Sequence, residues 1–205
     1  MSGDSGQEKH EAWEQIKAQA AEQFGGALVF GEGPLDARLV IIGEAPGEHE
    51  TAQKRPFVGR AGQLLDRLLR DAGIDRAEVY LTNVVKIRPT TEAGGRIKNR
   101  PPRVGEINAG LDILLPELTL VSPAALILFG NVPAKALIGK NFAMGANRGT
   151  WFTTTTGIPA LATYHPAYIL RLEGPPYDET RAQVVADLIT AREALTTPPQ
   201  ARALA

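Results

Sequence analysis

The sequence predicts a three-layer α/β/α fold, in which a central, mostly parallel sheet of four strands carries helices on both faces. Short apolar runs alternate with amphipathic stretches along most of the chain, and this alternation is typical of consecutive strand–helix units. The chain has 205 residues, of which 43% are hydrophobic, so it is long enough for one domain with a sizeable core. No repeat and no shift in composition indicates a boundary between domains.

Four apolar runs, each bounded by glycine, proline or polar residues, are the predicted strands. They are 38–42 (RLVII), 79–84 (VYLTNV), 124–129 (AALILF) and 158–162 (IPALA). The predicted helices are 9–24, 60–72, 103–118, 131–138 and 180–195. Within 60–72 the leucines fall on one helical face, and Gly73 follows the last turn, as is common at a helix C-terminus. We expect a disordered N-terminus over 1–8, a single domain over 9–196 and a flexible tail over 197–205.

The composition excludes several classes of function. The chain has no cysteine, which excludes disulfides, cysteine-ligated zinc, iron–sulfur clusters and a cysteine nucleophile, and we expect no cofactor. Three histidines, His10, His49 and His165, are too scattered to indicate a metal site. The net charge of −1 means that nucleic-acid binding would depend on local clusters of Lys and Arg. Without a signal-peptide core or an apolar run near the ~20 residues of a membrane span, we expect a soluble, cytoplasmic protein, nucleoid-associated if bacterial.

Ligands of parallel α/β sheets bind at the carboxyl ends of the strands, so the loops that follow the strands form the candidate site. These loops are 43–58, 83–103, 130–135 and 163–171. The first begins GEAPGEHE, a rigid turn in which Glu44 directly follows the strand, where a carboxylate would face a ligand. An ordinary strand–helix connection with solvated acids is the alternative. A phosphate loop is excluded, because GxxxxGK[ST] is absent.

Two further side chains suit the recognition of a flat base. Phe57 follows Pro56 and precedes a glycine-rich segment, where it is either a core anchor or a stacking platform. Asn83 ends the second strand, where it either caps a turn or presents one acceptor and two donors to a base edge. Uracil offers N3–H and O4 at that edge, and cytosine presents the reverse pair, so one fixed amide accepts uracil and rejects cytosine.

Residues 86–103 combine six cationic side chains with one acid, Glu92, and with Gly and Pro residues that predict an irregular loop. The cations are Lys86, Arg88, Arg96, Lys98, Arg100 and Arg103. Charged runs are usually solvated faces, but beside the predicted cleft this segment also suits contact with DNA phosphates.

The loop 163–171 contains His165, the only histidine that follows a predicted core strand. A lone histidine is more often structural than catalytic. Here Pro166 fixes the loop, and Ile169 and Leu170 are apolar residues without an obvious partner strand. Beside Arg171, this apolar pair suits a wedge that fills the gap left by an extruded nucleotide.

Taken in order, seven segments resemble the uracil-DNA glycosylase superfamily. They are GEAPGEHE, RPFVGRAGQLLDRLL, VYLTNVVKIRP, NRPP, LILFG, RGTW and TYHPAYILR. The resemblance covers roughly residues 28–195 and is closest to family 4. It implies flipping of uracil out of DNA, hydrolysis of its N-glycosidic bond, and release of uracil and an abasic site in base excision repair. The implied partners are uracil-containing DNA and free uracil, and one subunit is enough.

The resemblance also implies residue roles. Glu44 positions water or stabilises the developing sugar cation, and His165 hydrogen-bonds uracil O2 as negative charge gathers there. The implied substrate-binding residues are Gly43, Ala45, Glu50, Phe57 and Asn83, with Phe57 stacking on uracil, Asn83 recognising its edge and Glu50 near C5. The implied DNA contacts are Lys86, Arg88, Arg96, Lys98, Arg100, Ile169, Leu170 and Arg171.

The sequence departs from family 4, whose members hold an iron–sulfur cluster with four cysteines. Ile87 stands where that family has the cysteine of its KCRP motif, Gly110 stands in the segment that follows Glu106, and no CxxC lies in 9–24. We therefore expect no cluster, and we hypothesise that helix 9–24 and apolar packing around Ile87 replace it.

A second departure concerns a related subgroup that captures uracil-DNA covalently through a histidine in a KRRIH-like loop. Here GGRIK stands at the corresponding place, with Lys98 at the position of that histidine. We therefore expect turnover with release of the abasic site. Attack of Lys98 on the abasic aldehyde to give a Schiff base is the alternative, and contact with a phosphate explains this lysine more simply.

Three other functions stay open at this point. A member of the superfamily could prefer hypoxanthine or xanthine, although Asn83 favours uracil. A non-catalytic binder of uracil or abasic sites is disfavoured by the presence of both Glu44 and His165. A nucleotide-binding α/β domain is disfavoured by the missing phosphate loop and by the basic segment 86–103.

Overall fold

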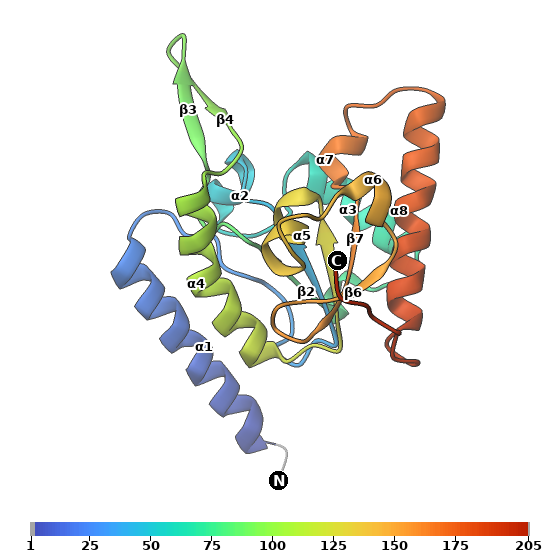
Figure 1. The fold of residues 1–205 in the computed structure, drawn as a ribbon. Coiled ribbons are helices and arrows are strands. Elements are labelled where there is room, and N and C mark those ends of the chain that lie inside the picture. Colours follow the sequence, from blue (N-terminus) through green and yellow to red (C-terminus); the bar gives the residue numbers. More distant parts are fainter. Residues whose placement is uncertain (1–2, 205) are drawn as a thin grey trace.

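The computed structural model describes residues 3–204 and confirms an α/β fold with a mostly parallel central sheet (Figure 1). The sheet has five strands rather than four, in the order β2-β1-β5-β7-β6. The four predicted strands are β1 (Leu39–Gly43), β2 (Val79–Asn83), β5 (Ala125–Phe129) and β7 (Pro159–Thr163), and they run parallel. The additional edge strand, β6 (Trp151–Thr153), is antiparallel to β7 and is too short to show a strand period in the sequence.

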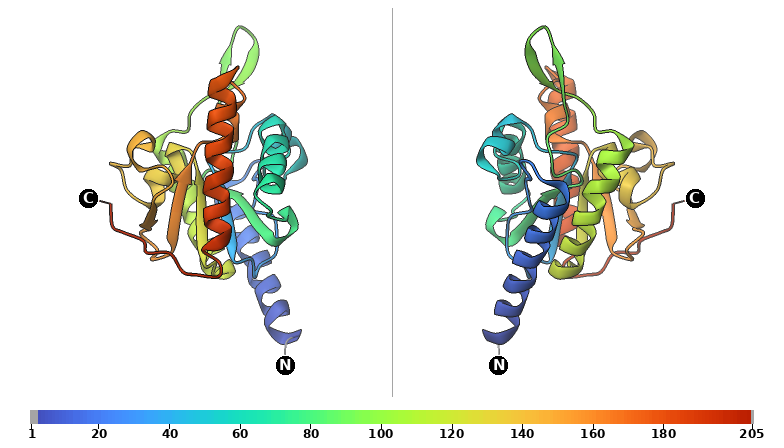
Figure 2. Two further views of the ribbon diagram at one scale, coloured as in Figure 1. Left: turned by 90° about the vertical axis from the view of Figure 1, so that its right-hand side faces the viewer. Right: turned by 90° about the vertical axis from the view of Figure 1, so that its left-hand side faces the viewer.

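Helices cover both faces of this sheet (Figures 1 and 2). One face carries α3 (Arg60–Asp71) and α8 (Pro175–Glu193), and the other carries α4 (Val104–Val121) and α5 (Asn131–Leu137). Outside α4 lies α1 (Gly3–Phe24). The short helices are α2 (Glu48–Gln53), α6 (Met144–Asn147), α7 (Pro166–Ile169) and the 3-10 turn η1 (Arg76–Glu78). None of the helices within residues 3–204 combines the length and the apolarity that crossing a bilayer requires.

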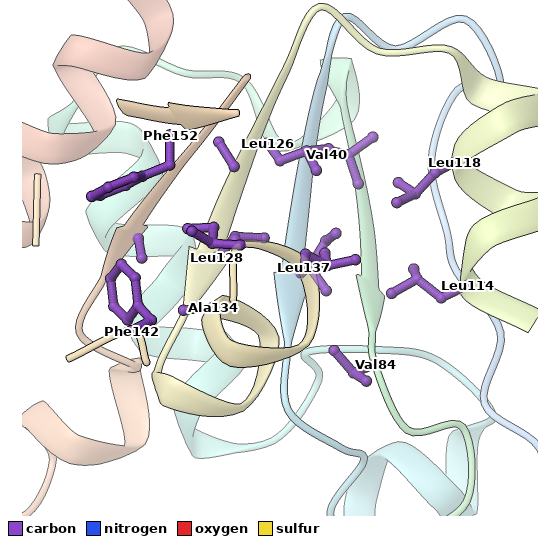
Figure 3. Close-up of a cluster of buried hydrophobic side chains, with 14 of the residues drawn as sticks. Val40, Val84, Leu114, Leu118, Leu126, Leu128, Ala134, Leu137, Phe142 and Phe152 are labelled. Carbon is purple, nitrogen blue, oxygen red and sulfur yellow. The ribbon is translucent and has the colours of Figure 1, made fainter. Parts of the chain in front are cut away.

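The core lies on both sides of the sheet because neighbouring strand residues point to opposite faces. Val40 (Figure 3) and Ile42 pack against the layer of α4 and α5, and Leu39 and Ile41 pack against the layer of α3 and α8. All five residues of β1 are buried, and the same holds for β2 and β5. Burial on both faces explains why these strands are continuous apolar runs in the sequence.

Secondary structure and contacts extend into both segments that the sequence predicts to be flexible. Residues 3–8 belong to α1, and nearby Lys9 Nζ donates a hydrogen bond of 2.9 Å to the carbonyl of Leu35. The C-terminal segment runs along β6, where Thr153 N donates to the carbonyl of Arg202 at 2.9 Å and Leu204 packs against the core. Contacts with β6 and with the core therefore hold Arg202 and Leu204, which belong to the predicted flexible tail. Residues 1, 2 and 205 lie outside the described part of the chain.

The segment 86–103, predicted to be irregular, contains an antiparallel hairpin of β3 (Thr90–Ala93) and β4 (Arg96–Asn99). Gly94 and Gly95 form its turn with φ values of 60° and 70°, a conformation that glycine adopts without strain. The glycines that suggested a loop are therefore the two-residue turn of a hairpin. The hairpin projects from the body of the molecule, at the end where α7 lies (Figures 1 and 2).

A buried ion pair joins the end of β2 to α4. Lys86 is 2% exposed, and its Nζ donates to the Glu117 carboxylate at 2.5 Å and to Thr82 Oγ1 at 2.6 Å. The same carboxylate accepts from Thr82 Oγ1 at 2.9 Å and from Gly31 N at 3.2 Å. The predicted contact of Lys86 with DNA is therefore wrong, because this ammonium group lies inside the core.

We expect Lys86→Met to lower the free energy of unfolding by about 3–5 kcal/mol, because Glu117 would stay buried without its partner. The double variant Lys86→Met/Glu117→Leu removes both charges and should recover most of that loss. Urea unfolding followed by circular dichroism measures both variants, with exposed Lys140→Met as the control. Equal stability of Lys86→Met and the wild type would contradict the structural role of the ion pair.

Candidate active site

A cleft with a volume of about 580 Å³ lies at the carboxyl ends of β1, β2 and β7. Three of the four predicted loops line it, namely 43–58, 83–103 and 163–171, together with the first turn of α3. The fourth loop, 130–135, does not, because Gly130 pairs with Thr163 and leads directly into α5. The cleft is thus built where the parallel topology predicts a ligand site.

The floor of the cleft depends on the close approach of three residues. Gly43 is the register partner of Asn83 in the β1/β2 ladder. A Cβ at Gly43 would lie 2.4 Å from Asn83 Oδ1 and 2.7 Å from Phe57 Cζ, so only glycine leaves room for both side chains. Asn83 is 4% exposed and lines the cleft, and no group in the described part of the chain hydrogen-bonds its amide. The amide is therefore available to a ligand.

Phe57 has an unusual backbone for a bulky residue, with φ at 55°. Two neighbours hold this conformation. Gly62 in α3 sits so close that a Cβ there would lie 1.9 Å from the Phe57 carbonyl, and Arg76 Nη2 donates to that carbonyl at 3.3 Å. The ring lies near-parallel to the imidazole of His165, with centroids 6.3 Å apart and an interplanar angle of 24°. Such strained conformations concentrate at functional sites, and Phe57 both anchors the core and lines the cleft.

His165 faces the cleft as a neutral donor. Its Nδ1 accepts a hydrogen bond from Ala167 N at 3.0 Å, which caps the first turn of α7. Burial lowers the pKa of His165 to about 4, and the positive charge of Arg171 acts in the same direction. With Nδ1 occupied as an acceptor, the neutral ring carries its proton on Nε2. The ring can therefore donate a hydrogen bond to a ligand at neutral pH.

Glu44 is half-buried and lines the same cleft as His165. Burial raises the pKa of Glu44, and the charge of Arg171 lowers it. The backbone is fixed because Val84 N donates to the Gly43 carbonyl at 2.9 Å and Val85 N donates to the Glu44 carbonyl at 3.0 Å. The β1/β2 pairing thus continues beyond the strands and holds this carboxylate at the cleft.

Glu50 ties the first loop together. Its carboxylate accepts hydrogen bonds from Gly47 N at 3.1 Å, Val58 N at 3.1 Å and Gly59 N at 2.7 Å. These donors belong to the start of α2 and to the residues that follow Phe57. Glu50 lines the cleft, but its contacts make it the residue that positions the Phe57 loop.

The predicted DNA contacts divide into three groups. Arg88, Arg100 and Arg171 line the cleft, although Arg100 is paired with Glu106 at 2.6 Å. Arg96 and Lys98 are exposed on the hairpin, outside the cleft. Leu170 is partly buried, and Ile169 is fully buried in the core, so the predicted insertion of Ile169 into DNA is wrong. Ile169 has no partner strand, but α7 turns it inwards.

Arg60, Asn99 and Tyr168 are among the residues that line the cleft but were not identified from the sequence. Arg60 directly follows the PFVG segment, and Tyr168 follows HPA, so both were close to recognised motifs. Asn99 reaches the cleft only because β3 and β4 pair, and Arg88 Nε donates to its Oδ1 at 2.7 Å.

A second cavity of about 140 Å³ lies between α1 and α4. It is lined by Ile87 and Gly110, together with Phe24, Leu28 and Ile113. A Cβ at Gly110 would lie 2.1 Å from the Val84 carbonyl, so a cysteine there would require the backbone to move. These residues do not fit an iron–sulfur cluster, because the wall is mostly apolar and carries no thiolate. Across residues 3–204, His, Asp and Glu side chains likewise form no group of three that could hold a metal ion.

Comparisons with known proteins agree with this geometry. A family model described as the uracil DNA glycosylase superfamily matches residues 30–189, which include every loop that lines the cleft. The chain is 38% identical over 166 residues to a type-4 uracil-DNA glycosylase of Thermotoga maritima, covering 80% of this chain and 81% of that protein. It is 37% identical over 179 residues to a type-4 uracil-DNA glycosylase of Saccharolobus solfataricus, covering 83% and 77%. A type-5 uracil-DNA glycosylase of Pyrobaculum aerophilum is 28% identical over 172 residues, covering 75% and 71%.

We expect Glu50→Gln to lower the free energy of unfolding by about 1–3 kcal/mol, because the amide NH₂ would face a backbone N–H that has lost its acceptor. Thermal or urea unfolding measures this loss. Glu48→Gln is the matched control: its carboxylate is 73% exposed and pairs only with Arg88 at the surface, so it should change stability by about 0–1 kcal/mol. Equal effects of the two substitutions would contradict the positioning role of Glu50.

Proposed function

The chain belongs to the uracil-DNA glycosylase superfamily and acts on uracil in DNA, and from this premise we propose how its cleft performs the reaction. The hydrolysis separates uracil from deoxyribose and leaves an abasic site, as the first step of base excision repair. The observation that carries the proposal is the convergence of Asn83, Phe57, Glu44 and a neutral His165 on one cleft. A duplex keeps its bases stacked, so the uracil has to flip into this cleft before it can react.

Asn83 and Phe57 recognise the flipped base. The Asn83 amide, which has no hydrogen-bond partner among the described residues, accepts from uracil N3–H and donates to O4. Cytosine presents the opposite pattern at these positions and would leave buried polar groups unpaired, which is the main source of discrimination. Phe57 stacks on the base, and Gly43 and Ala45 leave room for it beside the end of β1.

His165 stabilises the leaving uracil. As the glycosidic bond breaks, the electron pair moves onto the base and negative charge gathers at O2. The Nε2–H of the neutral ring donates to that oxygen, and because Ala167 N holds Nδ1, the ring does not need to reorient. His165 does not need to be protonated, since a fixed neutral donor stabilises the negative charge where it develops on uracil.

Glu44 acts at the sugar. Its carboxylate stabilises the positive charge that develops at C1′ and orients the water whose oxygen forms the new bond to C1′. One proton of that water is released, and the departing uracil anion takes up a proton, so atoms and charge balance. No covalent bond between protein and substrate is needed. The cavity lined by Ile87 and Gly110 has no cysteine, which supports the proposal that the enzyme works without an iron–sulfur cluster.

Cations around the cleft contact the DNA backbone. Arg88 and Arg171 line the cleft, and Arg96 and Lys98 extend this positive surface along the hairpin. Within β4, Lys98 points to the face opposite its neighbour Asn99, which lines the cleft. This alternation disfavours attack of Lys98 on the abasic site and supports turnover with release of the product. We also propose that one subunit is sufficient, because a single chain contains all of these groups.

Cleavage of a labelled oligonucleotide with a single uracil, followed by alkali treatment, tests the proposal. We expect His165→Ala and Glu44→Gln each to slow the single-turnover reaction by about 100-fold or more. Lys98→Ala should retain turnover, and a denaturing gel should show no crosslinked complex. The wild type should stay active when the reactions contain a chelator of metal ions.

The same assay separates the alternatives. Oligonucleotides with hypoxanthine, xanthine, thymine or cytosine replace uracil in parallel reactions, and binding is measured on the uncleaved DNA. Binding of uracil-DNA without cleavage would contradict the proposed glycosylase activity and would indicate a non-catalytic binder. Faster cleavage of hypoxanthine or xanthine would overturn the role of Asn83 in selecting uracil.

The pH profile gives a further prediction. Glu44 has to be ionised and His165 neutral, and since the pKa of His165 is about 4 whereas that of Glu44 is raised, Glu44 takes up a proton first as the pH falls. We expect Arg171→Gln to raise the pKa of both groups, because the charge of Arg171 lowers both. The acid limb of the single-turnover rate should therefore move to higher pH.

Single-turnover rates at saturating enzyme, measured from about pH 4 to pH 8, keep this effect apart from weaker DNA binding. Arg171→Lys retains the charge and is the matched control, with its acid limb near that of the wild type. Identical profiles for Arg171→Gln and the wild type would show that Glu44 does not set the acid limb.

A further inference from the structure

Ile169, one of the two apolar residues that the sequence suggested as a wedge, is buried in the core, and its neighbour Leu170 is partly buried. Extruding a nucleotide from a duplex leaves a gap in the base stack, and enzymes that flip bases commonly fill such gaps with an apolar side chain. Five large hydrophobic side chains are exposed in the described part of the chain: Ile87, Ile97, Val104, Leu115 and Tyr168. Of these, the hairpin residue Ile97 is 65% exposed and packs against none of the hydrophobic clusters.

The register of the hairpin places Ile97 on the cleft side. Thr90 pairs with Asn99 and Glu92 pairs with Ile97, so Asn99 and Ile97 stand on the same face. Asn99 lines the cleft, and a Cβ at Gly47 on the opposite loop would lie 3.7 Å from its Nδ2. Ile97 is one side-chain step, about 7 Å, further out along β4. Ile97 does not line the cleft itself, and this step places it beyond Asn99, towards the tip of the hairpin.

The rest of the hairpin suits contact with a duplex. Arg96 and Lys98 flank Ile97 on the other face of the strand, where they can reach phosphates. Gly94 and Gly95 form a turn without side chains, so the tip can approach the DNA backbone closely. Figures 1 and 2 show the hairpin standing clear of the body at the end of the molecule where α7 lies, and Asn99 at the end of β4 lines the cleft.

Of these five side chains, Tyr168 is the one that lines the cleft, but it already has partners. Its ring centroid lies 5.4 Å from that of Tyr164, and the Arg171 guanidinium lies 5.8 Å from it. These contacts fix Tyr168 on the cleft wall. Ile97 has no comparable neighbour, and its exposure is accounted for if DNA covers it.

We propose that Ile97 is the wedge of this enzyme, which enters the base stack from the β3–β4 hairpin and fills the space left by the flipped uridine. This inference rests on the proposed function, because a wedge has a role only if uracil is extruded from a duplex. It adds a residue whose effect depends on duplex structure and not on the chemistry of bond cleavage.

Single-turnover cleavage of uracil in single-stranded DNA, in a U:A duplex and in a U:G duplex tests the proposal. We expect Ile97→Ala to slow the cleavage of uracil in the U:A duplex by about tenfold or more, because unstacking and unpairing cost a few kcal/mol. Single-stranded uracil, which has no duplex to leave, should change by less than about threefold. The weaker U:G pair should lie between the two, and Ile97→Leu should restore most of the activity on U:A.

Two further measurements sharpen the test. A pyrene nucleotide opposite uracil fills the gap by itself, so it should restore the rate of Ile97→Ala. Leu115→Ala on the outer surface of α4 is the matched control, since it removes an exposed apolar side chain (37% exposed) from a different surface, and it should match the wild type on every substrate.

The outcomes are distinguishable. A wild type that cleaves uracil, with an Ile97→Ala variant equally fast on the U:A duplex, would overturn the wedge alone. An equal loss on single strands and duplexes would also overturn it, because a general DNA contact would explain that result. A wild type that cleaves none of the substrates would overturn the proposed function and the wedge with it.

Discussion

The parallel register of β1 and β2 is the constraint on which the site depends. It sets Gly43 beside Asn83, and hydrogen bonds from Val84 and Val85 continue the pairing past the ends of both strands. Because Gly43 has no side chain, the Asn83 amide and the Phe57 ring can occupy the space that a Cβ would fill. Gly43 therefore contributes to the site because it has no side chain that would displace these two groups.

The remaining parts of the site are held by groups that do not react. Glu50 gathers three backbone N–H groups from two sides of the first loop, and Gly62 permits the left-handed backbone of Phe57. Ala167 N fixes the tautomer of His165, and burial keeps that ring neutral. The cleft is thus preorganised by backbone hydrogen bonds and packing, which is how a fixed donor can stabilise charge without moving during the reaction.

The cations of the chain serve two different purposes. Lys86 neutralises Glu117 in the core, and Arg100 is paired with Glu106, so both charges stabilise the fold. None of the ion pairs found within residues 3–204 involves Arg96 or Lys98, and these side chains stand on a hairpin that packs little against the body. A protein with a net charge of −1 can therefore still present a positive surface to DNA.

The sequence by itself determined the class of the fold and four of the five strands, because strands buried on both faces are continuous apolar runs. It also identified the three loops that meet at the cleft, with a fourth that does not line it, because parallel strands end at one edge. Motif order also singled out Glu44, Asn83 and His165. Only the tertiary structure decided that Lys86 and Ile169 are buried, that Asn99 reaches the cleft and that Ile97 is exposed on the hairpin. Those outcomes depend on which face of a helix or hairpin meets the body, and local composition carries no information about a partner that lies far away along the chain.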